Sequence, residues 1–141
     1  TLGTIWVVFV SDDFLGPFQS FLITLGVPLA AWAGILIADI LRRRKDYDED
    51  ALFDARGRYG SWDWVSIGTM IVASIIGWGF VVNGFAEDAP WNNWQGYLLG
   101  LVGGKEGEWA YANLGVFFAL VVSFVVTWFA RAGKIRQQEA A

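Results

Sequence analysis

Residues 18–45 read FQSFLITLGVPLAAWAGILIADILRRRK. No charged side chain occurs from position 18 to position 38, and four consecutive basic residues end the stretch at 42–45. As an α-helix, residues 18–41 would rise about 36 Å, which is enough to cross a bilayer with some tilt. The abrupt basic end is typical of the cytoplasmic flank of a transmembrane helix. We therefore expect a complete membrane span at about 18–41.

Two further apolar runs, at about 64–82 and 110–130, have the length and composition of membrane spans, and 55% of the chain is hydrophobic. The sequence thus predicts an all-α integral membrane protein with three transmembrane helices. Residues 1–10 are apolar but too short to span. We interpret them as the end of a preceding span, so that 1–141 would be the C-terminal part of a longer protein. A trimmed or processed small protein is the alternative.

The basic residues predict the orientation. Nine of the ten lie in 42–63 or after position 130, and only Lys105 lies in 83–109. The positive-inside rule then makes 42–63 a cytoplasmic loop, puts the C-terminus in the cytoplasm and makes 83–109 an extracellular loop. Aromatic residues in 83–109 predict that it lies in the membrane interface, with a short helix at 91–101. A short amphipathic helix is expected at 48–56. The predicted location is the plasma membrane, crossed several times.

Gly26 and Pro28 interrupt the middle of the first span. Proline has no N–H, so the carbonyl of Thr24 loses its helical partner. In lipid that carbonyl must find another donor, and we expect a kink that faces protein or water. Small residues recur every four positions in each span, which allows another helix to approach closely. We expect these rows to contact helices outside the chain. They are Gly26, Ala30, Gly34 and Ala38; Thr69, Ala73 and Gly77; and Gly115, Ala119, Ser123 and Thr127.

Asp39 is the one ionisable residue near the hydrocarbon region. It precedes Arg42 and Arg43 by three and four residues, a spacing at which helical side chains meet. We expect a cytoplasmic ion pair among these residues. It could be a local feature of the helix end, or it could be a latch to another helix on the cytoplasmic side.

The sequence lacks the groups used in most enzyme sites. It contains no cysteine and no histidine, which excludes zinc–thiolate sites and thiol catalysis and removes the commonest general base. No glycine-rich phosphate loop follows a strand. We therefore expect no catalytic residues, no metal site, no cofactor, no enzyme activity and no nucleic-acid partner. The expected surroundings are the lipid bilayer.

The pattern from 18 to about 80 resembles the C-terminal part of the nucleobase:cation symporters, the purine-cytosine permease and allantoin/hydantoin transporter group. The resemblance rests on a Phe-Leu start, a glycine- and proline-broken centre, an Ala-Asp ending before arginines, and a Tyr-Asp…Leu-Phe…Gly-x-Tyr-Gly loop. These are Phe21-Leu22, 26–34, Ala38-Asp39, 42–44, Tyr47-Asp48, Leu52-Phe53 and 57–60. The chain differs from the family at Ile40, where an aromatic residue is usual, and at Asp63, where asparagine is common.

The resemblance implies that the three spans are helices ten to twelve of a twelve-helix LeuT-like transporter with inverted repeats. It implies import of a nucleobase or related heterocycle (cytosine, a purine, allantoin or hydantoin) with H⁺ or Na⁺ by alternating access. The coupling ion would be bound by upstream helices outside this chain. The outer half of the 18–41 helix would be a substrate gate formed by Phe18, Phe21, Leu22, Thr24, Gly26 and Pro28. Ordinary packing beside a structural kink is the alternative for these residues.

Three classes of function remain open at this point. A transporter segment is the expected one. A small integral membrane scaffold or accessory subunit without transport activity is the alternative. A membrane enzyme is third, because histidine and cysteine are lacking.

Overall fold

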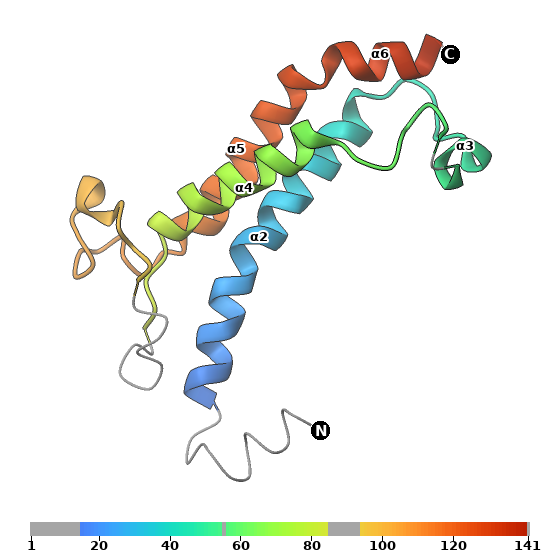
Figure 1. Cartoon of the computed structure of the whole chain (residues 1–141). Coiled ribbons are helices and arrows are strands. Elements are labelled where there is room, and N and C mark those ends of the chain that lie inside the picture. The colour runs from blue at the N-terminus through green and yellow to red at the C-terminus, as the bar shows by residue number, and fades with distance from the viewer. Residues whose placement is uncertain (1–14, 55, 85–93, 141) are drawn as a thin grey trace, which may run out of the picture.

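The computed structural model describes residues 15–54, 56–84 and 94–140 (Figure 1). Within these ranges every regular element is helical and no strand occurs, which confirms the predicted all-α class. The elements are α2 (Leu15–Arg42), α3 (Glu49–Phe53), α4 (Trp64–Gly79), the 3₁₀ turn η2 (Leu99–Val102), α5 (Leu114–Ala130) and α6 (Ala132–Ala140). The expected end of a preceding span at 1–10 lies outside the described residues.

The first predicted span is present as the long helix α2, and it runs through Pro28 as one element. Pro28 does not end the helix, and the expected second donor for the freed carbonyl is present, while the expected kink stays a prediction. The indole Nε1 of Trp78 in α4 donates to the carbonyl oxygen of Thr24 at 2.9 Å. Proline is tolerated inside an apolar helix when a neighbouring helix satisfies the backbone in this way.

The other two predicted spans are shorter as helices than the apolar runs that suggested them. The second ends at Gly79 because the next residue leaves the helical region, with φ −111° and ψ 16° at Phe80. The third begins only at Leu114, since Asn113 has the left-handed φ of 51°. By length and composition, Gly16–Arg42 could cross a membrane by itself, and α5 and α6 could do so together across a 53° bend.

The two short predicted helices are also smaller than expected. The 48–56 helix is reduced to α3, which Asp48 caps by accepting a hydrogen bond from Ala51 N–H, and the chain is extended again at Asp54. Of the predicted 91–101 helix, residues 91–93 lie outside the described part, and the only helical element in the remainder is η2. Gly103, with φ 109°, ends that turn.

The three long helices pack on one another through small side chains. α2 contacts α5 most extensively, and α4 packs against both (Figure 1). The buried cluster between them consists of Val27, Ala30, Ala31, Ala73, Val81 and Ala119. A Cβ at Gly34 would collide with the backbone of α5 at Leu120. A Cβ at Gly77 would lie only 2.8 Å from the carbonyl oxygen of Gly115.

These contacts confirm that the rows of small residues are packing faces and correct the prediction about their partners. The rows on α2, α4 and α5 contact each other inside the chain, whereas the prediction gave them partners outside it. The larger apolar side chains of α2 consequently point the other way. Phe21, Leu29, Trp32 and Ile40 are each about half exposed.

Candidate functional site

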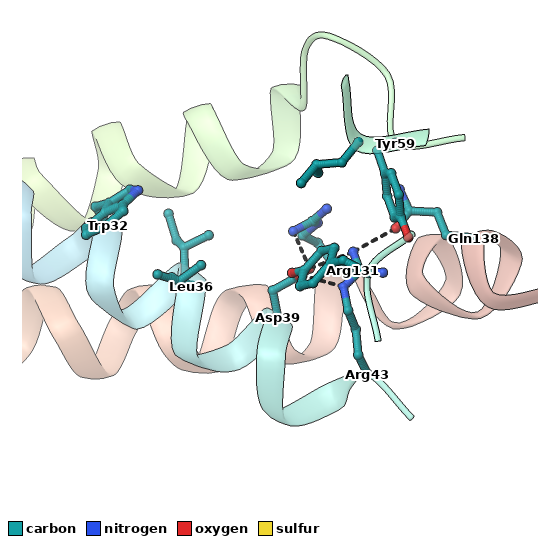
Figure 2. Close-up of a pocket in the computed structure, with 10 residues that line it drawn as sticks. Trp32, Leu36, Asp39, Arg43, Tyr59, Arg131 and Gln138 are labelled. Atoms are coloured by element: carbon teal, nitrogen blue, oxygen red, sulfur yellow. Dashed lines mark hydrogen bonds and ion pairs between the residues drawn. The ribbon is translucent and has the colours of Figure 1, made fainter. Parts of the chain in front are cut away.

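A cluster of charged residues lies where α2 ends and where α5 bends into α6 (Figure 2). Its centre is Asp39, in the last turn of α2 and only 4% exposed. Arg43, one turn further on, donates from Nε to Asp39 Oδ2 at 2.7 Å. Arg131 donates from Nη1 to Asp39 Oδ1 at 2.5 Å, and the hydroxyl of Tyr47 donates to Oδ2. Both carboxylate oxygens are therefore occupied, which is the condition under which a buried charge is tolerated.

Arg131 connects this centre to a second carboxylate. Its Nε lies 2.9 Å from Oδ2 of Asp63, the residue that precedes α4. Lys134 Nζ lies 3.0 Å from the other oxygen of Asp63. Arg131 occupies this place because it ends α5, where its N–H still donates to the carbonyl of Thr127 at 3.0 Å before the chain turns into α6. One arginine thus joins the ends of α2, α4 and α5.

The charges around Asp63 control its titration. Burial raises the pKa of the Asp63 carboxyl, but the hydroxyl of Ser66 and the cations of Lys134 and Arg131 outweigh burial. The net result is a pKa below the ordinary value, so the charged form is favoured in the folded protein.

Aromatic and amide groups enclose the other side of Arg43. Its guanidinium lies 4.3 Å from the ring centre of Tyr47 and 5.3 Å from that of Tyr59. Its Nη2 also donates to Oε1 of Gln138 in α6 at 2.9 Å (Figure 2). Burial and the hydrogen bond to Asp39 both raise the pKa of Tyr47, so this phenol stays protonated and remains a donor.

Beside these groups is a hollow of about 220 Å³, lined on its apolar side by Trp32, Ile35, Leu36 and Leu52. The polar groups facing it already bind one another. Among the described residues, no group of three or more acidic, histidine or cysteine side chains could hold a metal ion. The arrangement joins the ends of α2, α4 and α5.

The ion pair at Asp39 differs from the prediction in one of its two arginine partners. Arg43 contacts Asp39, but the guanidinium of Arg42 lies over the ring of Trp128, 4.9 Å from its centre. The expected role of Arg42 is taken by Arg131, which is 92 positions away in the sequence. The physical reason is packing, because α5 lies against α2 and brings its own terminal arginine to the carboxylate.

The six residues proposed for a gate fall on two sides of α2. Phe18, Phe21 and Leu22 are between 41% and 49% exposed and lie on the outward side of this helix group. Thr24, Gly26 and Pro28 are partly buried. The Thr24 hydroxyl accepts from Gln95 Nε2 at 3.0 Å, in addition to the Trp78 bond to its carbonyl.

Sequence reasoning missed several residues of these two clusters, namely Tyr47, Asp63, Trp78, Gln95, Arg131 and Lys134. A signal for Arg131 existed: it follows the third apolar run directly, and the basic-residue count had predicted that this end lies on the same side of the membrane as the end of the 18–41 span. For Gln95 no sequence signal distinguished it from other loop amides.

One comparison with known proteins gives a match. A family model described as permease for cytosine/purines, uracil, thiamine and allantoin matches residues 1–103, which is 103 of the 141 positions. The matched region includes α2, α3, α4 and η2. Neither the search of curated proteins nor that of solved structures gives a match.

Proposed function

The chain belongs to the family of permeases for cytosine/purines, uracil, thiamine and allantoin, and from this premise we propose that it is the C-terminal part of a secondary transporter. The transporter imports a nucleobase or related heterocycle together with H⁺ or Na⁺ by alternating access. The family match is the observation that supports the proposal most, because it covers the long apolar helix and the loop that follows it.

In this proposal α2, α4 and the α5–α6 pair cross the plasma membrane, and the C-terminus is cytoplasmic. Further helices of the same protein, upstream of this chain, hold the coupling ion and most of the substrate site. They cover the large apolar side chains of α2 that point away from α4 and α5. The arrangement of the twelve-helix LeuT-like fold is part of the same proposal.

The N-terminal half of α2 serves as the gate. Phe18, Phe21 and Leu22 present exposed apolar surface on the side away from α5, where a planar heterocycle could stack. Thr24 lies one turn further on and is tied to α4 by Trp78 and to the following loop by Gln95. These two bonds give the gate a fixed end, and the segment before Thr24 provides the moving part.

An uptake assay tests this proposal. Cells expressing the complete reading frame are assayed with radiolabelled cytosine, uracil, hypoxanthine and allantoin. Phe21→Ala removes a ring on the proposed stacking face. Stacking of a base on an aromatic side chain is worth about 1–3 kcal/mol, so KM for the transported compound should rise at least about fivefold. Ile37→Ala, also exposed but in the other half of α2, is the matched control and should change KM less than twofold. Equal effects of the two variants would argue against a gate at Phe21.

Topology is tested separately. Residues 1–141 contain no cysteine, so single cysteines can be introduced at exposed positions. An impermeant thiol reagent should label Glu106→Cys in intact cells and should label Asp46→Cys only after the cells are opened. The opposite pattern would overturn the proposed orientation.

A further inference from the structure

A second pocket lies on the other side of the α2 end from the Asp39 cluster. It has a volume of about 490 Å³ and is formed by the end of α2 and the bend between α5 and α6. Three arginines line it, Arg42, Arg44 and Arg136, together with Glu139. The remaining lining residues are Leu41, Trp128, Ala132 and Ile135.

The charges of this pocket are not balanced. In the part of the chain that the structure describes, none of the three guanidinium groups makes an ion pair with a carboxylate. Glu139 uses its Oε1 to accept from the backbone N–H groups of Arg44 at 2.5 Å and Lys45 at 3.2 Å. Three positive charges and one negative charge leave the pocket with two positive charges.

The neighbouring surface is apolar. Leu41, which lines the pocket, is 63% exposed, and Phe129, which follows the lining residue Trp128 in α5, is 73% exposed. Arg42 keeps its position by lying over the ring of Trp128. A ligand with one anionic group and long apolar chains would match both surfaces at once.

We propose that this pocket, hereafter the arginine pocket, binds the phosphate of an anionic phospholipid. Guanidinium groups bind phosphate oxygens through paired, directional N–H bonds, and basic pockets beside membrane helices attract anionic headgroups. The acyl chains of the lipid lie along Leu41 and Phe129. A free phosphate ion would use the arginines only and would leave the apolar surface unused. The inference does not depend on which substrate is transported.

The test is a lipid titration of the complete protein in detergent, followed by its thermal unfolding midpoint. Phosphatidylglycerol should raise the midpoint in a saturable manner, and phosphatidylcholine should not. Inorganic phosphate at the same concentration should also have no effect. Equal protection by phosphatidylcholine would overturn the proposal, and equal protection by inorganic phosphate would replace the lipid with a free anion.

Arg136→Gln is the main variant, because this exposed side chain makes no ion pair within the described ranges and its loss should leave the fold intact. Each basic residue near the surface contributes about 1 kcal/mol of attraction to anionic lipid, so the concentration of phosphatidylglycerol for half-maximal protection should rise about fivefold. Arg136→Lys keeps the charge and should lose less. Arg56→Gln removes a charge that is also exposed but lies outside the pocket, and this variant should behave as wild type. If Arg56→Gln weakened protection as much as Arg136→Gln, the arginine pocket would have no special role.

Discussion

Replacing Asp39 by asparagine tests whether the charged cluster holds the helix ends together. The change keeps the shape of the side chain but removes the charge that faces Arg43 and Arg131, in a position whose side chain is only 6% exposed. Removing one partner of a buried ion pair costs about 3–5 kcal/mol, because the remaining charge is left uncompensated. Arg131 keeps Asp63 at 2.9 Å, so we expect the loss in unfolding free energy at the lower end, about 3 kcal/mol.

The measurement is chemical unfolding of the protein in detergent micelles. Asp48→Asn is the control, since it also removes a carboxylate from an arginine pair, but in an exposed position. That variant should change the unfolding free energy only slightly. In an Arg131→Gln background, Asp39→Asn should cost clearly less than in the wild type, because one of the two cations that it leaves without this partner is then absent. If Asp39→Asn and Asp48→Asn were equally mild, the cluster would not be a structural junction.

Three further predictions concern other contacts. Gly34→Ala should destabilise the protein by about 1–3 kcal/mol because its Cβ meets the backbone of α5, whereas Gly68→Ala, which meets nothing within 4 Å, should be neutral or stabilising by up to about 1 kcal/mol. Unfolding curves that rank the two glycine variants the other way would contradict the packing. Trp78→Phe should cost about 1–3 kcal/mol, measured in the same way, because it leaves the carbonyl of Thr24 without a donor; no change would mean that this bond is unimportant. The pKa of Asp63 is lowered by folding, so its contribution to stability is present above the ordinary value of 3.8 and is lost as the pH falls through the lower folded value. When the unfolding free energy is measured as the pH is lowered, Asp63→Asn should lack this part of the loss. An unchanged dependence on pH in the acid range would refute the assignment.

The sequence predicted correctly those features that depend on the residues of a single helix. The apolar length of α2, the need of the Thr24 carbonyl for a second donor, and the four-residue rows of small side chains all follow from single-helix geometry, and the structure confirms each of them. The family also followed from local patterns, because its motifs lie mostly in one helix and one loop.

Partners across the bundle could not be predicted in the same way. Asp39 has two candidate arginines nearby in sequence, and only the packing of α5 on α2 decides that Arg131 takes the place of Arg42. The helix ends were also misplaced. Hydropathy continues past Gly79 and begins before Leu114, but the backbone angles of Phe80 and Asn113 end the helices earlier than composition suggests.

The partners of Asp39 have a consequence for the order in which the protein is synthesised. Arg43 and Tyr47 follow it by 4 and 8 residues, whereas Arg131 follows it by 92. At a translation rate of about 5–20 residues per second, Arg131 is synthesised roughly 5–18 seconds after Asp39. During that interval Arg43 and Tyr47 can already donate hydrogen bonds to the Asp39 carboxylate. Arg43 and Tyr47 are therefore available to Asp39 first, and the contact with Arg131 becomes possible only after α5 has been synthesised.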